Sequence, residues 1–478
     1  MSQPANSPQP DGTAKVSVFE KRKKIYAKGV RGLFDNWRIA LVIFTQILFY
    51  VSPWLVWNGR QAILLHLVER KFYIFGMVFW PQDVIYLAAL LIVSAYALFL
   101  VTAVAGRLFC GYACPQTVYT QIFMWIENKI EGDRNARIKL DKSTGARKLR
   151  IKATKHFVWL LFSLWTGFTL VCYFTPVTEL IHNVMTNNLG SWEIFWIFFY
   201  GGFTYLFAGF MREQVCKYLC PYARFQSAMF DKDTLIITYD VERGEPRGSR
   251  SRKADHKSLG LGACVDCSLC VQVCPTGIDI RQGLQYECIG CAACIDVCDG
   301  VMDKMGYARG LVRYDTQNGV QHHLGRGHFW RRVLRPRVLV YSGILLLILA
   351  ALLTSLVLRT PFKVDVVRDR ASLARVVDEG RIENIYRLQV MNATESTHHY
   401  RLAVEGMPGI RLDGPSEVDL TAAEAKWVTL NVQVPPETAS SAGSGAHPIR
   451  FRIELMEDGA GPAVAASISE KSTFVVPR

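Results

Sequence analysis

The stretch from 264 to 298, CVDCSLCVQVCPTGIDIRQGLQYECIGCAACIDVC, decides how the rest of the chain is interpreted. It contains two runs with the same intervals: three cysteines with two residues between neighbours, then a fourth after three more residues. Such spacings are typical of metal ligands and not of a disulfide framework. All 13 cysteines of the chain lie between Cys110 and Cys298. We therefore expect reduced thiols on the cytoplasmic side of a membrane.

The double run resembles the bacterial two-cluster ferredoxins, in which three cysteines of one run and the last cysteine of the other hold each cluster. This resemblance predicts two [4Fe–4S] clusters, one held by Cys264, Cys267, Cys270 and Cys298 and the other by Cys288, Cys291, Cys294 and Cys274. The alternative is a pair of zinc sites, which usually have CxxC pairs separated by longer gaps. One position departs from the pattern, since Asp299 stands where the first run has Pro275. Its negative charge is expected to lower the potential of a nearby cluster.

Long apolar runs without Asp, Glu, Lys or Arg lie on both sides of the cysteine-rich stretch. They cover residues 39–57, 84–106, 157–178, 194–211 and 338–358. Each run has about 18–23 residues, or roughly 27–35 Å as a helix, which matches the hydrocarbon core of a membrane. We predict a multi-domain membrane protein with an α-helical transmembrane domain of five helices, into which an α+β two-cluster ferredoxin domain is inserted.

The distribution of basic residues predicts the orientation. Lys and Arg together number 8 in residues 1–38, 3 in 58–83, 11 in 107–156 and none in 179–193. Basic loops stay on the cytoplasmic side, so the N-terminus and the ferredoxin domain are expected there. The net charge of +14 is explained by these loops and by anionic lipid heads, and not by nucleic acid. The apolar stretch 72–80 is too short to span and is expected at the outer interface.

The last 120 residues change character. Segments 385–390, 428–434 and 449–455 alternate apolar and polar residues, with Gly, Pro, Asn and Asp between them. This pattern is typical of an antiparallel, all-β sandwich of the immunoglobulin-like kind, which the orientation places in the periplasm. The neighbouring His398 and His399 point to opposite faces of a strand, so they are interpreted as surface residues.

These observations predict the domain order. It comprises a cytoplasmic, disordered and basic tail (1–36), a four-helix transmembrane domain (37–230), a basic linker (231–260), the ferredoxin domain (261–330), the fifth transmembrane helix (337–358) and the β-sandwich (360–478). Segment 243–257 is basic and without periodicity, which favours a solvated linker. The alternative is contact with lipid heads or with an anionic electron donor.

Two further cysteine pairs match each other, CGYACP at 110–115 and CKYLCP at 216–221. Residues at i and i+4 share one face of a helix, and proline then ends or kinks the helix. If the two helix ends adjoin, four thiols meet, namely Cys110, Cys114, Cys216 and Cys220. This group could hold a metal, a further iron–sulfur cluster or a reversible disulfide. Soft thiolates favour Cu(I) over Cu(II), so a bound cupric ion would be easier to reduce there.

The paired CxxxCP motifs, the tandem cysteine runs, the last helix and the β-sandwich together resemble the FixG/RdxA/CcoG family of cytochrome c oxidase accessory proteins. Local matches are RKFYIFG at 70–76 and CPTGIDIR at 274–281. The resemblance implies a bacterial inner-membrane protein that takes part in assembling a cbb3-type oxidase. It also implies an oxidoreductase that reduces Cu(II) to Cu(I) for copper delivery, with oxidase assembly factors and copper transport proteins as partners.

Two other functions fit the same residues. One is a quinol-linked electron conduit, as in the NapH- and NosR-like membrane ferredoxins, which would need a quinol pocket. The other is a non-redox copper-binding scaffold that docks the oxidase through the β-sandwich. The sequence contains no GxGxxG, no P-loop and no Ser/His/Asp arrangement that would support a hydrolase. No flavin or nicotinamide site is visible either, so the sequence does not identify the electron donor.

Overall fold

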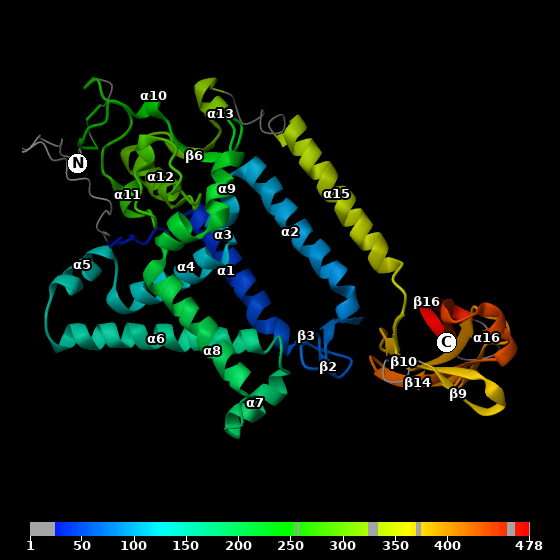
Figure 1. Cartoon of the computed structure of the whole chain (residues 1–478). Helices are drawn as coiled ribbons and strands as arrows, with labels where there is room; N and C mark the ends of the chain where they lie inside the picture. Colours follow the sequence, from blue (N-terminus) through cyan, green and yellow to red (C-terminus); the bar gives the residue numbers. More distant parts are fainter. Residues whose placement is uncertain are drawn as a thin grey trace, which may run out of the picture.

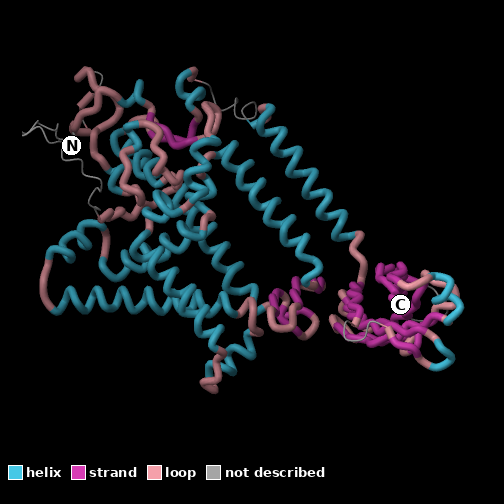
Figure 2. Tube along the Cα trace, viewed as in Figure 1, coloured by secondary structure: helices cyan, strands magenta, loops and turns pink. Residues whose placement is uncertain are grey.

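The computed structural model describes residues 24–252, 254–255, 258–323, 333–369, 374–456 and 464–477. Residues 1–23 of the predicted disordered tail (1–36) lie outside this range, whereas residues 24–36 lie within it. The described residues form a helical membrane domain, with the cysteine-rich domain at one end of its helices and a β-domain at the other (Figure 1). Most strands belong to the β-domain (Figure 2). The predicted helical, ferredoxin and all-β parts of the chain are thus confirmed.

The membrane domain consists of helices of very different length. They are α1 (Leu33–Val51), α2 (Val84–Ala105), α3 (Leu108–Tyr112), α4 (Pro115–Glu131), α5 (Arg134–Lys142), α6 (Ala146–Val171), α7 (Val177–Met185), α8 (Ser191–Thr204), the π-helical segments η3 (Tyr205–Met211) and η4 (Val215–Leu219), α9 (Pro221–Met229) and α15 (Pro336–Val357). Helix α8 continues into η3, and α15 lies beside α2 (Figure 1).

Among the described residues, four helical stretches are long and apolar enough to cross a membrane: Leu33–Trp54, Pro81–Ala105, Ser191–Met211 and Pro336–Val357. They correspond to four of the five predicted runs. The predicted count of five is not confirmed, because run 157–178 is not one helix. Helix α6 ends at Val171, and Pro176 is the N-cap of α7. The chain leaves the helical conformation between Val171 and Pro176, so the end of the run belongs to a second helix.

Helices α6 and α8 cross closely at two glycines. A Cβ atom on Gly201 would lie 2.9 Å from the backbone oxygen of Ser163, and one on Gly167 would overlap the backbone oxygen of Ile197. Small residues at a crossing point allow two helix backbones to approach. This contact fixes α8, and through it the segment that leads to Cys216.

The cysteine-rich domain is small and contains short elements. They are β6 (Ile236–Tyr239), α10 (Val241–Gly244), α11 (Leu269–Gln272), the 3-10 turn η5 (Ile280–Gln282), α12 (Ala293–Met305), β7 (Val312–Asp315) and α13 (Gln317–Gln321). Strands β6 and β7 pair antiparallel. Their buried side chains Ile237, Tyr239 and Val312 pack against Ile295 and Met302 of α12. Each cysteine run therefore lies on a common apolar core.

Much of the predicted linker 231–260 belongs to this domain. Besides containing β6 and α10, it pairs with the chain just before the first cysteine run. The amide of Ala263 donates to the oxygen of Arg243, and the amide of Gly262 donates to the oxygen of Pro246, each at 2.8 Å. Segment 243–257, interpreted as a solvated linker, therefore packs against the cysteine-rich domain over residues 243–250. A basic, glycine-rich composition does not reveal backbone pairing with a distant segment.

Helix α12 docks on the start of α1. The carboxylate of Asp296 accepts hydrogen bonds from the amides of Phe34 (3.1 Å) and Asp35 (2.8 Å) in the first turn of α1. A Cβ atom on Gly32 would overlap this carboxylate. Asp296 thus caps a membrane helix from another domain, and it also places a negative charge at the positive end of the helix dipole.

Replacing Asp296 with alanine is expected to destabilise the protein by about 1–2 kcal/mol, because two amides of α1 lose their acceptor. Thermal unfolding of the detergent-solubilised protein measures the change. Asp303→Ala is the matched control, since Asp303 lies on the same helix but is exposed and pairs only with the exposed Arg309. Equal melting temperatures for the two variants would contradict the capping role.

The β-domain is a sandwich of two antiparallel sheets. Its elements are β8 (Phe362–Arg368), β9 (Arg375–Val376), β10 (Ile382–Asn392), β11 (His398–Glu405), β12 (Arg411–Asp413), β13 (Glu417–Leu420), β14 (Ala425–Val434), α16 (Pro436–Ala442), β15 (Gly445–Met456) and β16 (Val464–Val476). One sheet has the order β12-β14-β10-β8, with β9 paired to β10, and the other has the order β13-β11-β15-β16. Tyr386 and Phe451, from opposite sheets, are fully buried with ring centroids 5.0 Å apart. The predicted alternation of buried and exposed residues produces this core.

The sandwich rests on the loop between α1 and α2. There, β3 (Ile63–His66), β4 (Lys71–Ile74) and β5 (Met77–Phe79) form a sheet, after the short hairpin of β1 (Val56–Trp57) and β2 (Arg60–Gln61). Val78 and Trp80 pack against Met391 and Ala393 of the sandwich. Stretch 72–80, expected at the membrane interface, therefore forms part of a docking surface for the sandwich.

Candidate metal centres

The two cysteine runs adopt matching backbone conformations. Ser268 precedes α11 and Ala292 precedes α12, and both have left-handed dihedral angles, with φ of 50° and 59°. Helix α11 ends after one turn, since Pro275 follows Cys274. Helix α12 runs on to Met305, because Asp299 occupies the equivalent position and is compatible with a helix. The Asp299 carboxylate accepts a hydrogen bond from the amide of Gly310 (2.9 Å).

The structure brings the first predicted ligand set together around one cavity. Its lining includes Cys264, Cys267, Cys270 and Cys298, together with Arg281 and the apolar side chains of Leu311 and Met302. Arg281 forms ion pairs with Asp279 (2.7 Å) and Asp266 (2.5 Å) beside this cavity. Cys267 is exposed, so this cavity has a thiol at the protein surface.

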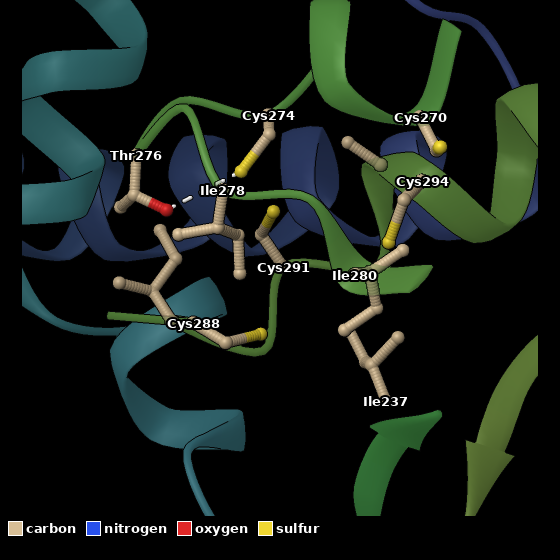
Figure 3. Close-up of a pocket in the computed structure, with 11 residues that line it drawn as sticks. Ile237, Cys270, Cys274, Thr276, Ile278, Ile280, Cys288, Cys291 and Cys294 are labelled. Atoms are coloured by element: carbon tan, nitrogen blue, oxygen red, sulfur yellow. Dashed lines mark hydrogen bonds between the residues drawn. The ribbon is translucent and has the colours of Figure 1, made fainter. Parts of the chain in front are cut away.

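The second predicted set lines a separate cavity. Cys274, Cys288, Cys291 and Cys294 surround it, together with Ile237, Ile278 and Ile280. Figure 3 shows these four sulfur atoms around a common space. Cys270 of the first set also lines this cavity, so the two cavities adjoin at Cys270. The hydroxyl of Thr276 is 3.3 Å from the Cys274 sulfur. The isoleucines keep the surroundings of this cavity apolar.

The chemistry of both cavities fits a metal cluster. Burial raises the pKa of Cys270 to about 11 and that of Cys288 to about 12. Burial also raises the pKa of Cys298 to about 12, with Asp299 acting in the same direction. Such thiols stay protonated at neutral pH unless a cation replaces the proton. Four thiols around an apolar space are the ligand set of a [4Fe–4S] cluster.

The CxxxCP pairs also share one local geometry, but it differs from the predicted continuous helix. Cys110 lies in α3, whereas Cys114 is the N-cap of α4, with Pro115 as the first helical residue. In the second pair Cys216 lies in η4 and Cys220 is the N-cap of α9. Proline is favoured at the first position of a helix because it has no amide hydrogen to satisfy. Each proline therefore begins a new helix instead of ending the old one.

The four thiols of these pairs lie close together. The thiol of Cys110 interacts electrostatically with those of Cys114 and Cys220, and the thiol of Cys216 interacts with all three others. Burial raises the pKa of Cys110 to about 11 and that of Cys216 to about 12. The fully buried amide of Gln226 donates to the Cys110 sulfur at 3.3 Å. We call Cys110, Cys114, Cys216 and Cys220 the four-thiol group.

The four-thiol group adjoins the second cavity. Cys110 and Cys216 pack against Val273, Ile289 and Cys291 in one apolar cluster. A Cβ atom on Gly111 would lie 2.8 Å from the backbone oxygen of Gly290 and 2.9 Å from the backbone of Cys291. The loop that presents Cys291 therefore touches the helix that carries Cys110.

Sequence reasoning missed the polar residues that support these sites. Arg38 of α1 is buried, pairs with Asp35 and reaches to 3.5 Å from the backbone oxygen of Cys291. Arg107 donates to the backbone oxygens of Tyr286 and Ala223. In the sequence, both arginines contribute only to the number of basic residues that predicts the orientation. Their long-range partners leave no signal in a single sequence.

The remaining cysteine and the histidine pair occupy ordinary structural positions. Cys172 is buried with Val177 and Leu180. His399 pairs with Asp419 on the surface of the sandwich. Across the described residues, no group of three or more His, Cys, Asp or Glu side chains is arranged to hold a single metal ion.

Comparison with protein families supports the assignment of the cysteine runs. A family described as a 4Fe-4S dicluster domain matches residues 211–317, and one described as a 4Fe-4S binding domain matches residues 87–132. The first match includes both cysteine runs and the second CxxxCP pair, and the second match includes Cys110 and Cys114. A third family, described as the IG-like fold at the C-terminus of FixG, matches residues 352–477.

Several curated proteins are similar over most of their length. The nitrogen fixation protein FixG of Rhizobium meliloti (strain 1021) is 38% identical over 450 residues, which cover 87% of this chain and 85% of that protein. RdxA of Cereibacter sphaeroides is 36% identical over 473 residues, covering 96% and 98%, respectively. RdxB of the same organism is 38% identical over 433 residues, covering 88% and 91%. The similarity extends through the membrane, cysteine-rich and β-domains.

Proposed function

Since this chain belongs to the FixG/RdxA family, we propose that it is a membrane-bound iron–sulfur electron-transfer protein that reduces Cu(II) to Cu(I) during assembly of a cbb3-type cytochrome c oxidase. The observation that carries this proposal is the contact between the four-thiol group and the loop of Cys291. Copper is the substrate in this proposal, and the electron comes from the cysteine-rich domain.

We assign one [4Fe–4S] cluster to Cys264, Cys267, Cys270 and Cys298, the surface site, and another to Cys274, Cys288, Cys291 and Cys294, the membrane-proximal site. The two cavities support this division. When bound, such clusters accept and donate one electron at a time. The exposed thiol of Cys267 marks the place where a one-electron donor can approach.

The four-thiol group is the proposed exit for the electron. Gly111 lets α3 approach the Cys291 loop, so Cys110 and Cys216 lie next to the membrane-proximal site. The four thiols are not arranged around a single metal ion in this structure, so binding of Cu(II) would have to draw them together. A Cu(II) ion bound there would take up one electron and become Cu(I), and a cluster held by Cys274, Cys288, Cys291 and Cys294 would supply that electron. Thiolates bind Cu(I) more favourably than Cu(II), so the ligands favour the reduced product.

The basic residues support an orientation for this reaction. Described parts of the two basic segments contact the cysteine-rich domain, through Lys28 and Asp35 in one and Gly111 in the other. We place this domain on the cytoplasmic face of a bacterial inner membrane. The sandwich is then periplasmic. Oxidase assembly factors and copper transport proteins are the proposed partners.

Changing all four thiols of the four-thiol group to serine is expected to reduce the rate of Cu(II) reduction at least tenfold, since copper loses its soft ligands. The measurement is anaerobic formation of Cu(I), detected with a Cu(I)-specific chelator, from purified protein reduced beforehand. Cys172→Ala is the control, because Cys172 is buried away from both cavities and from the four-thiol group.

Iron and acid-labile sulfide are measured in the same preparations. Undiminished Cu(II) reduction by the fourfold variant, with its iron content intact, would refute the role of these thiols. Freeze-quench EPR during addition of Cu(II) is expected to show oxidation of the clusters as Cu(I) forms. Clusters that stay reduced would instead indicate a non-redox scaffold.

A further inference from the structure

A buried arginine lies between the membrane-proximal site and the four-thiol group. Arg107 is 8% exposed and is the N-cap of α3, two residues after the end of α2. Its Nη2 donates to the backbone oxygen of Ala223 in α9 (2.6 Å), and its Nη1 donates to that of Tyr286, shortly before Cys288. The guanidinium thus links the helix after the second CxxxCP pair to the loop that presents Cys288.

The backbone of Arg107 contacts the same loop. A Cβ atom on Gly290 would lie 3.0 Å from the backbone oxygen of Arg107, and Gly290 has a positive φ of 69°. A side chain at Gly290 would be both strained and crowded. Residue 107 therefore holds the loop through its main chain and its side chain.

The charge of Arg107 acts on both neighbouring thiol sets. Burial raises the pKa of Cys110, Cys216 and Cys288, and the Arg107 guanidinium acts in the opposite direction on each of them. In the part of the chain that the structure describes, no carboxylate forms an ion pair with Arg107. Burying a cation without a counter-charge is costly. Negatively charged cysteine-bound centres on its two sides would supply that counter-charge.

We propose that Arg107 is a positioning residue for electron transfer. Its charge stabilises the extra electron at the membrane-proximal site, and its contacts with Tyr286 and Ala223 hold that site against the four-thiol group. The inference rests on the proposed function, because it requires a cluster at this site. A nearby positive charge favours the more negative, reduced state and so raises the reduction potential.

The test uses variants that retain one assigned site each. Cys298→Ala leaves the membrane-proximal site complete, and Cys274→Ala leaves the surface site complete. Adding Arg107→Gln to Cys298→Ala is expected to lower the potential by about 59 mV, which corresponds to a tenfold change in a one-electron equilibrium. Adding it to Cys274→Ala is expected to leave the potential unchanged. EPR-monitored redox titration provides both values.

Arg250→Gln is the matched control. Arg250 donates to the backbone oxygens of Gly262 (2.8 Å) and Cys264 (3.3 Å), so it belongs to the surface site. It is expected to lower the potential in the Cys274→Ala background and not in the Cys298→Ala background. Arg107→Lys keeps the charge but lacks the planar fork that reaches two carbonyl oxygens. It is expected to retain the parent potential and to reduce Cu(II) more slowly.

Equal shifts in the two backgrounds, or no shift in the Cys298→Ala background, would overturn the role of Arg107. An Arg107→Lys variant with a lowered potential would also overturn it. Iron and acid-labile sulfide in the one-site parents separate this failure from that of the proposed function. Parents without iron and sulfide would refute the cluster sites themselves.

Discussion

Cys298→Ala will remove about four iron atoms per chain. The cluster that remains will be the one bound by the other three cysteines of the second run, although Cys298 belongs to the same run. The reason is the interleaved ligand set. Cys298 lines the cavity of Cys264 and Cys267, while Cys274 lines that of Cys288 and Cys291. Iron analysis and EPR of the reduced, purified protein measure the effect.

The same spectra decide between interleaved and local ligand sets. The spectrum of Cys298→Ala should match that of Cys264→Ala, and the spectrum of Cys274→Ala should match that of Cys288→Ala. Cys172→Ala should retain the spectrum of the unmodified protein. Pairing of the Cys298→Ala spectrum with that of Cys288→Ala would mean that each run holds its own cluster.

A second large effect is expected in the membrane domain, where Glu127 of α4 is almost fully buried among three cations. Its carboxylate lies 3.0 Å from Arg212, 3.1 Å from Arg137 and 3.5 Å from Lys155. Lys155 also pairs with Glu131 (2.8 Å), so Glu127→Ala removes the carboxylate partner of Arg137 and Arg212 in particular. Because these two cations are then buried without a counter-charge, the free energy of unfolding should fall by about 3–5 kcal/mol. Thermal unfolding in detergent measures the loss.

Glu69→Ala is the control for this prediction. Glu69 is half exposed, and its one ion pair among the described residues is with Lys71, so its loss should cost less than about 1 kcal/mol. Similar melting temperatures for the two variants would show that the cations around Glu127 find other partners.

The same carboxylate predicts how stability depends on pH. Burial alone would raise the pKa of Glu127, but Arg212, Lys155 and Arg137 outweigh burial and lower it. A carboxyl whose pKa is lower in the folded than in the unfolded protein stabilises the fold above its ordinary pKa. That contribution is lost as the pH falls through the lowered value.

The resemblance to two-cluster ferredoxins predicts the same grouping of the eight cysteines that the two cavities have. Spacing along the chain places three cysteines of each group, but the fourth comes from the other run. The apolar runs likewise predicted four of the helices that are long enough to span. In run 157–178, Pro176 indicates that a new helix begins near the end of the run, but it does not predict that α6 already ends at Val171. In the CxxxCP pairs, the sequence predicts that proline ends or kinks a helix, but Pro115 and Pro221 each start one.

Other features depend on contacts that composition does not encode. The Asp296 cap joins α12 to the start of α1, which is more than 260 residues away in sequence. Arg107 likewise joins the start of α3 to Tyr286 and Ala223. The basic segment at 243–250 resembled a linker because its pairing is made by backbone amides, which every sequence has. Such contacts become visible only when the elements are placed in space.

The length of α2 separates the two ends of the molecule. Asp83, just before α2, pairs with Arg359 next to the sandwich, whereas Thr102 near the other end bonds Tyr222, which follows the second CxxxCP pair. The 22 residues of α2 span roughly 33 Å. Any molecule held by the sandwich is therefore about a bilayer away from Cys216, and no cysteine occurs beyond Cys298 to relay an electron. If copper is reduced at the four-thiol group as proposed, it has to cover this distance before it reaches a partner docked on the sandwich.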